Sequence, residues 1–165
     1  MRINFYALRA IYFHEMDRFR RTLIQSLLSP VLSTSLYFIV FGSVIGDYVQ
    51  KIDGISYGSY IVPGLLMLTL LTQSISNTSF GIFFPKFNGT IYEILAAPIS
   101  TVEIVIAYVG AGATKTLIVA AVIFCTSLFF AEVNVKFPLL MIFLLILVAF
   151  TFALFGFLIG LLSKN

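Results

Sequence analysis

The sequence has 165 residues, of which 60% are hydrophobic and only 10% are charged, and its mean hydropathy is +1.06. A soluble domain of this size could not keep such a composition in water, so the chain is expected to be a polytopic membrane protein. The net charge of +3 decides little alone, because the placement of Lys and Arg, rather than their sum, orients a membrane protein.

Residues 2–22 are too polar to span a bilayer and are predicted to form an amphipathic helix. Apolar side chains recur on one helical face, and most charged side chains fall off it. The apolar stripe consists of Leu8, Tyr12, Met16, Phe19 and Leu23. Such a helix is expected to lie in the membrane interface, either as an anchor or as an elbow that contacts a cytoplasmic partner. His14 has no second His or Cys nearby, so no metal site is expected here.

Four long apolar runs follow and are predicted to be spans. They cover residues 23–45, 60–84, 104–130 and 139–162. Pro30 interrupts the first run, and Pro85 is predicted to end the second helix. Because spanning segments must satisfy their backbone groups internally, the expected fold is an all-α transmembrane helix bundle, with residues 1–165 forming one domain.

The polar segment 88–100 separates the second and third apolar runs. Thr90-x-x-Glu93 and Ser100-x-x-Glu103 have the spacing of capping boxes, which start helices. Pro98 disfavours helical geometry at the residue before it. The sequence therefore predicts a helix of about two turns, a break, and a new helix start.

This short helix has an apolar face made by Ile91, Ile94 and Leu95, which follow helical spacing. A capped helix with an apolar face outside the bilayer is expected to dock against something. The functional alternative is a helix that transmits motion, and the structural alternative is a turn that ends one span and begins another.

Orientation follows from the basic residues. Half of the ten Lys and Arg residues precede the first span, namely Arg2, Arg9, Arg18, Arg20 and Arg21. Positive charge marks the cytoplasmic side, so the N-terminus is predicted to be cytoplasmic. Four spans then place loops 46–59 and 131–138 outside, and segment 85–103 and the C-terminus inside.

Polar residues within the spans are the candidate residues of a substrate path. Thr69, Gln73, Ser76 and Asn77 form one helical stripe, which lipid would penalise. The stripe either hydrogen-bonds neighbouring helices, which is favoured, or lines a path. Lys115 either extends to the cytoplasmic surface, which is favoured, or faces a wet cavity.

The glycines of the apolar runs predict close helix packing. Residues 110–116 superficially suggest a phosphate loop, but Thr114 stands where that motif requires Gly, and no strand precedes it. The small residues there, like Gly156-x-x-x-Gly160, are expected to let helices approach closely. No catalytic motif is present, so the chain is not expected to be an enzyme, nor to bind a metal or cofactor itself.

Three motifs give the sequence a family resemblance. LYFIVFG at residues 36–42, followed by Ile45-Gly46, resembles the first span of ABC-2-type transporter permeases. YIVPGLLM at residues 60–67 resembles the start of their second span, and IYEILAAPIS at residues 91–100 resembles the segment that carries their coupling helix. The motifs occur in the family's order, and the resemblance runs over the whole chain.

The resemblance implies the membrane subunit of an ATP-driven exporter in the inner or plasma membrane of a prokaryote. It implies a second permease chain, as a homodimer, and two copies of an ATPase subunit that uses the ATP. Residues 2–22 would be the connecting helix. The implied ATPase-coupling residues are Ile91, Tyr92, Glu93, Ile94, Leu95, Ala96, Ala97 and Pro98.

Such permeases typically have six spans, so the resemblance also implies that this chain is truncated after the fourth. Two other classes stay open: a fragment of a secondary transporter or channel, and a membrane scaffold without transport. The former would favour acidic residues in the spans, and none is there. No nucleic-acid partner is expected, and the substrate cannot be read from the sequence.

Overall fold

The computed structural model describes residues 4–45, 56–131, 133 and 135–163. The helices are α1 (Phe5–Arg21), α2 (Leu23–Tyr37), the π-helical η1 (Phe38–Ile45), α3 (Tyr57–Phe87), α4 (Ile91–Ala96), α5 (Thr101–Phe130) and α6 (Pro138–Leu162). Four helical stretches, one in each predicted span, are long and apolar enough to cross a membrane. The predicted all-α polytopic bundle is thereby confirmed, whereas the interfacial position of residues 2–22 stays a prediction.

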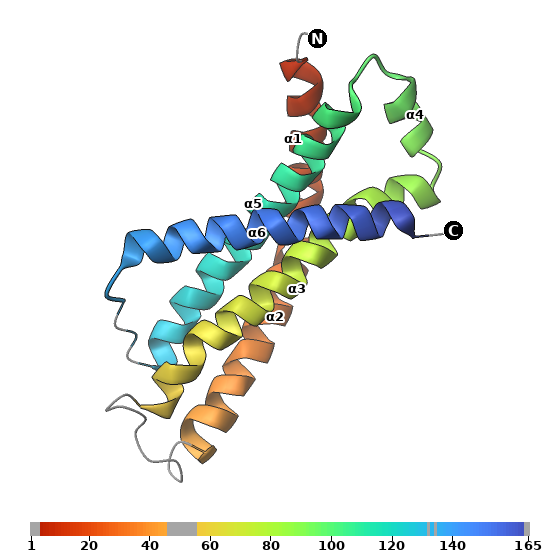
Figure 1. Cartoon of the computed structure of the whole chain (residues 1–165). Helices are drawn as coiled ribbons and strands as arrows, with labels where there is room; N and C mark the ends of the chain where they lie inside the picture. The colour runs from red at the N-terminus through yellow and green to blue at the C-terminus, as the bar shows by residue number, and fades with distance from the viewer. Residues whose placement is uncertain (1–3, 46–55, 132, 134, 164–165) are drawn as a thin grey trace.

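Helix α5 is the centre of the bundle, with α1 and α2 against one side and α3 and α6 against another (Figure 1). Small residues on α5 are buried, among them Ala107, Ala111, Gly112 and Ala113. Small side chains let neighbouring backbones approach, which is how helices pack where no hydrophobic effect drives them together. With 30 residues, α5 is about 45 Å long, more than the hydrocarbon core of a bilayer requires.

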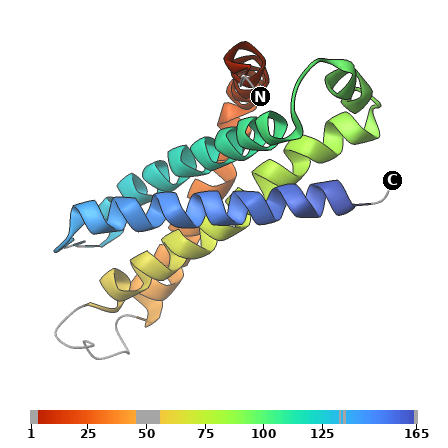
Figure 2. The same ribbon diagram turned by 45° about the horizontal axis from the view of Figure 1, so that its top comes forward.

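Helix α6 lies obliquely across α3, as Figure 2 shows, and two glycines set their close approach. A Cβ at Gly156 would lie 2.5 Å from the carbonyl oxygen of Ile75, and one at Gly160 would lie 2.6 Å from that of Ser79. The hydroxyl of Ser74 donates to the Ala149 carbonyl across the same contact at 2.6 Å. The predicted packing role of Gly156-x-x-x-Gly160 is confirmed.

The glycines of the 110–116 run differ from one another. A Cβ at Gly112 would collide with the hydroxyl of Thr78 on α3, whereas a Cβ at Gly110 would meet no atom within 4 Å. Close packing on α3 therefore depends on Gly112, and the expectation for Gly110 is wrong within the described part of the chain.

Pro85 does not end the second span, contrary to the prediction. Helix α3 continues through Pro85 to Phe87, and the backbone N–H of Asn88 still donates to the Phe84 carbonyl. Proline removes only one N–H, and membrane helices tolerate that loss. The chain leaves the helix at Gly89, whose φ of +78° favours glycine.

That turn also explains why the predicted Thr90–Glu93 capping box is absent. An N-cap residue is normally extended, but Thr90 follows the turn in helical conformation, with φ −63° and ψ −14°, and its side chain caps nothing. Ser100 is extended, with φ −78° and ψ 150°, and its predicted capping box with Glu103 is confirmed.

We expect Gly156→Ala to destabilise the protein by about 1–3 kcal/mol, because the new methyl group would force α3 and α6 apart. Gly110→Ala is the matched control and should be neutral or stabilising by at most about 1 kcal/mol, since its methyl group meets open space. Denaturant titration of each variant in mild detergent measures the difference. Equal losses would contradict the glycine contact.

Candidate functional site

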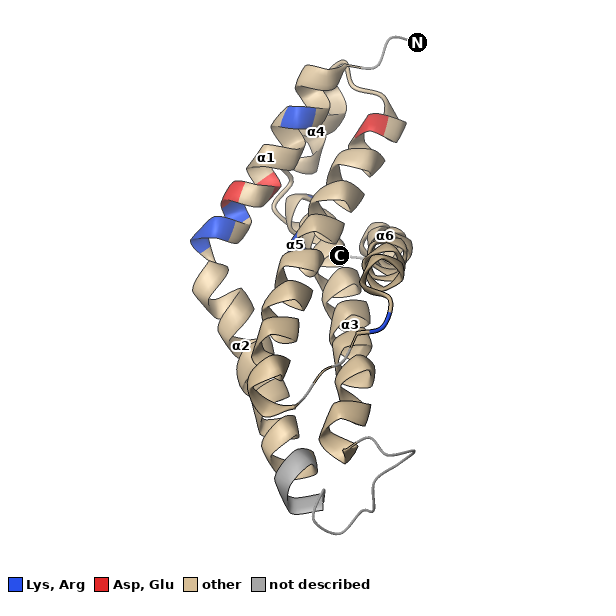
Figure 3. Cartoon of the chain, turned by 90° about the vertical axis from the view of Figure 1, so that its left-hand side faces the viewer, with Lys and Arg blue, Asp and Glu red and all other residues tan. Residues whose placement is uncertain are grey.

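Helix α1, helix α4 and the start of α5 lie at one end of the molecule, and the C-terminal end of α6 lies beside the end of α3 (Figure 1). Lys86, near the end of α3, donates to the carbonyl oxygens of Leu161 at 2.9 Å and of Ser163, so it caps α6. In Figure 3 most of the charged residues of the described chain lie on α1 and at this end, while the opposite ends of α2, α3 and α5 carry none. The ends of two predicted spans, those of α3 and α6, are thus held together next to α4.

Helix α4 divides the apolar face that the sequence assigned to it. Ile91 and Ile94 are half-buried and pack on the bundle core. Leu95 instead points outward, 62% exposed, together with Tyr92, which is 73% exposed. The large apolar side chains that α4 exposes are therefore Tyr92 and Leu95, whereas Ile91 and Ile94 attach α4 to the bundle. This corrects the expectation that Ile91, Ile94 and Leu95 form one common face.

Helix α1 lies along the first half of α5 and is held there by polar contacts. The backbone N–H of Asn4 donates to Glu103 Oε1 at 2.6 Å, so the carboxylate that caps α5 also holds the start of α1. Further along, the Tyr12 hydroxyl donates to Thr114 Oγ1 at 3.1 Å. Later residues of α1 contact later residues of α5, so the two helices lie side by side and run in the same direction.

A buried charged cluster completes this interface. Lys115 is 3% exposed and its Nζ lies 2.7 Å from Glu15 Oε2, and Glu15 is itself 2% exposed. Arg18 Nη2 lies 2.9 Å from the same carboxylate oxygen, whereas Glu15 Oε1 is buried and has no hydrogen-bond partner. The expectation that Lys115 reaches the surface is wrong, because α1 covers it and supplies a carboxylate.

Glu15 is the main residue that sequence reasoning missed. The signal was present, since Glu15 follows Tyr12 by three positions and precedes Phe19 by four, which puts it on the apolar stripe of α1. A carboxylate on a buried face requires a cationic partner. Lys115 is a cation within an apolar run, but the sequence does not show that these two helices are neighbours.

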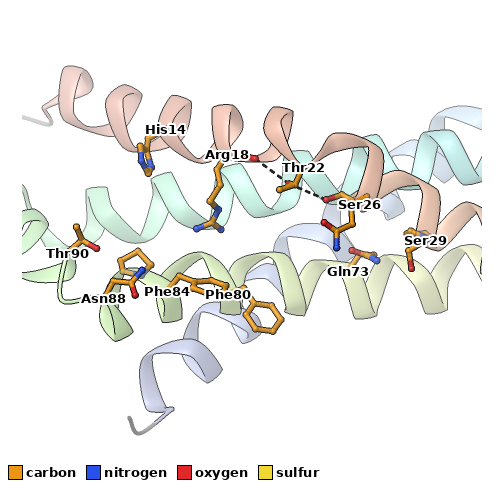
Figure 4. A pocket seen from close by; sticks show the side chains of 13 residues that line it. His14, Arg18, Thr22, Ser26, Ser29, Gln73, Phe80, Phe84, Asn88 and Thr90 are labelled. Carbon is orange, nitrogen blue, oxygen red and sulfur yellow. Dashed lines mark hydrogen bonds between the residues drawn. The ribbon is translucent and has the colours of Figure 1, made fainter.

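An elongated hollow, here called the α2–α3 groove, separates α1 and α2 from α3 (Figure 4). Its main part has a volume of about 840 Å³ and extends from His14 and Thr90 to Ser29 and Gln73. A smaller hollow of about 190 Å³ shares Ser29, Pro30 and Gln73 with it and extends the groove toward η1. This volume is in the range of pockets that hold drug-sized ligands.

The groove includes only part of the predicted polar stripe. Thr69 and Gln73 line it, but Ser76 is exposed outside it. Asn77 turns to α5, where its Nδ2 lies 3.4 Å from Thr116 Oγ1, so it has the packing role that was the favoured alternative. The single stripe thus serves more than one purpose.

Helix α2 contributes a polar stripe of its own, which was not predicted to line a groove. Ser26, Ser29 and Ser33 of α2, together with Thr22 immediately before the helix, line the groove. They recur at helical spacing, so the pattern was visible, but it could not show that α2 and α3 turn these faces toward one another.

Comparison with known proteins identifies the family of this chain. The family model of ABC-2 type transporters matches residues 6–165. The chain belongs to the ABC-2 type transporter family. It is 37% identical over its whole length to proteins named inner membrane transport permease YadH, from Escherichia coli strain K12 and from Shigella flexneri.

This ABC-2 family chain spans 64% of the length of those relatives. No solved structure matches it significantly. The family match therefore identifies the kind of membrane domain, and the residues of α4 and of the α2–α3 groove keep the status of candidates.

Because Glu15 pairs with two cations, its replacement should lower stability more than the replacement of Lys115. Glu15→Gln should cost about 3–5 kcal/mol of stability, because it leaves buried Lys115 unpaired beside Arg18. Lys115→Met should cost less, since Arg18 still pairs with Glu15. The double variant should recover most of the loss of Glu15→Gln, as a double-mutant cycle in detergent would measure. Equal single losses that simply add would contradict this arrangement.

Proposed function

We propose that this chain is the membrane permease subunit of an ABC exporter, in which α4 couples a separate ATPase to the helices that line the substrate path. The observation that carries the proposal is the form of α4 in a chain of this family: it is joined to the bundle by Ile91 and Ile94 and exposes Tyr92 and Leu95. ATP is then bound and hydrolysed by the partner, and the permease binds no cofactor of its own.

The location of α4 supports coupling in mechanical terms. It connects α3 to α5, and Lys86 ties the end of α3 to the end of α6. A displacement of α4 therefore reaches three helices through packed contacts and hydrogen bonds. Glu103 adds α1 to the same unit, because it caps α5 and accepts from the Asn4 amide.

The orientation that fits this role has the α4 end in the cytoplasm, where ATP is available. The basic residues of α1 support it, because Arg9, Arg18, Arg20 and Arg21 all lie before the first span. The complete assembly that the family resemblance implies is a pair of permease chains with two ATPase subunits in the prokaryotic inner membrane.

The α2–α3 groove is the proposed part of the substrate path. Hydroxyl and amide side chains line it, and lipid would penalise these groups if they faced it directly. The groove also begins next to α4, because Asn88 and Thr90 line its end. Motion of α4 would therefore change the width of the groove at that end.

The coupling proposal predicts the effect of replacing the exposed pair. Tyr92→Ser combined with Leu95→Ser should weaken co-purification with the ATPase by about tenfold or more, since exposed aromatic and apolar anchors often dominate an interface. Export driven by ATP should fall in parallel. Both are measured in membranes that contain the permease and its ATPase.

Two controls separate docking from folding. Phe129→Ser alters a residue that is 89% exposed in the last turn of α5, at the end far from α4, and should leave the ATPase bound. Ile94→Ser should instead reduce the folded amount, because Ile94 packs on the core. Normal ATPase binding and export by the Tyr92 and Leu95 double variant would rule out α4 as the coupler.

The path proposal predicts that Gln73→Leu alters export rate or substrate preference by about tenfold, with the folded amount unchanged, because the change removes a polar group from the groove. Ser76→Ala is the matched control on the same helix, outside the groove, and should behave like the unmodified protein. Transport into inverted membrane vesicles provides the measurement. If export by Gln73→Leu is unchanged, Gln73 has only a packing role and the path proposal is wrong for this residue.

A further inference from the structure

The charges around the α2–α3 groove do not cancel. The carboxylate of Glu15 pairs with both Lys115 and Arg18, so one negative charge faces two positive ones. Lys115 is buried in the helix interface, whereas Arg18 is partly exposed and lines the groove. The surplus positive charge of the cluster is therefore presented to the groove by Arg18.

Nothing acidic in the groove balances that charge. Among the described residues that line either hollow, none is Asp or Glu, and the polar ones other than Arg18 and His14 carry only hydroxyl or amide groups. Lys115 matters here although it does not reach the groove. By sharing the carboxylate, it prevents Glu15 from neutralising Arg18.

The guanidinium of Arg18 retains donors for a ligand. Arginine has five N–H donors in a planar fork, and the recorded ion pair uses Nη2. Figure 4 shows the side chain extending from α1 across the groove toward α3. A carboxylate or phosphate group can accept two parallel hydrogen bonds from such a fork.

Beside Arg18 the opposite wall of the groove is apolar. Phe80 and Phe84 on α3 line this part and are both substantially exposed, and Pro85 follows them. A cation beside an exposed aromatic wall matches a ligand with an anionic group joined to an apolar body. The neutral polar side chains Gln73, Ser26 and Ser29 continue from there toward η1.

From these observations we propose that the α2–α3 groove binds anionic amphiphiles, with a phosphate or carboxylate group on Arg18 and the apolar part along Phe80 and Phe84. This inference rests on the proposed function in one respect, namely that the bound amphiphile is the molecule that is exported. The site itself consists of residues of this chain, so binding can be measured without the ATPase.

The test is calorimetric titration of the full chain in nanodiscs of phosphatidylcholine. Octyl phosphate should bind about tenfold or more tightly than octyltrimethylammonium, which has the same chain and the opposite charge. Octyl phosphate should also bind more tightly than inorganic phosphate, which lacks the apolar part. Equal binding of octyl phosphate and octyltrimethylammonium, or of octyl phosphate and inorganic phosphate, would overturn the proposal.

Matched arginine variants locate the site. Arg18→Gln should weaken octyl phosphate binding by about tenfold or more, because charge-assisted hydrogen bonds are lost. Arg21→Gln, at an exposed position on the same helix and outside the groove, should leave binding unchanged. Equal affinity in these two variants would place the anion elsewhere and refute the assignment.

Arg18→Lys covers the case in which Arg18→Gln does not fold. It keeps the charge but loses the fork, so it should retain the preference for octyl phosphate over octyltrimethylammonium at reduced affinity. Loss of that preference in folded Arg18→Lys would count against Arg18 as the anion partner.

A second set of nanodiscs distinguishes a lipid headgroup from a free amphiphile. If membrane lipid is the natural occupant, equal parts of phosphatidylglycerol should compete and weaken octyl phosphate binding, and Arg18→Gln should remove that competition. If a free amphiphile is the occupant, phosphatidylglycerol should have no such effect. Binding without export would refute the proposed function and leave this site intact, and export with no anion preference would refute the site alone.

Discussion

The arrangement of the bundle depends on how α1 is attached to α5. A carboxylate on α1, Glu15, is buried against Lys115, and a carboxylate on α5, Glu103, accepts from the backbone of Asn4. Burying a charge is costly unless it is paired, so neither helix can leave the other without exposing an unpaired ion in an apolar environment. These contacts fix α1, and α2 follows it after the single residue Thr22.

The groove is a consequence of that attachment. With α1 and α2 held on one side of α5, and α3 and α6 held on another, the polar faces of α2 and α3 stand opposite each other without packing together. The helices come close together at small residues: Gly112 of α5 contacts Thr78 of α3, and Gly156 of α6 contacts Ile75 of α3. Tight packing on one face of α3 thus accompanies an open space, lined by polar and aromatic side chains, on the other.

The end of the bundle near α4 combines these parts. Lys86 caps α6, Ser100 and Glu103 cap α5, and Ile91 and Ile94 attach α4 to the core. Orphan carbonyl and amide groups at helix ends must be satisfied, and here they are satisfied by side chains of neighbouring segments. The same hydrogen bonds that complete the helix ends therefore make this end of the molecule one connected unit.

Composition and local spacing were enough to predict the all-α fold class, the four apolar helices, the helix start at Ser100 and the packing role of Gly156 and Gly160. These features depend on composition and on local spacing, which a linear sequence contains. Sequence reasoning failed at Thr90 and Pro85, where the left-handed turn at Gly89 and the tolerance of a long helix for one missing hydrogen bond decided the geometry.

Which helix faces contact one another could not be predicted and is seen only in the folded chain. The fold paired Glu15 with Lys115, residues 100 positions apart, and it turned Asn77 toward Thr116 while leaving Gln73 in the groove. It also directed Ile94 inward and Leu95 outward on the same short helix. The physical reason is that helical spacing assigns residues to a face, but the neighbour of that face depends on how helices distant in sequence pack together.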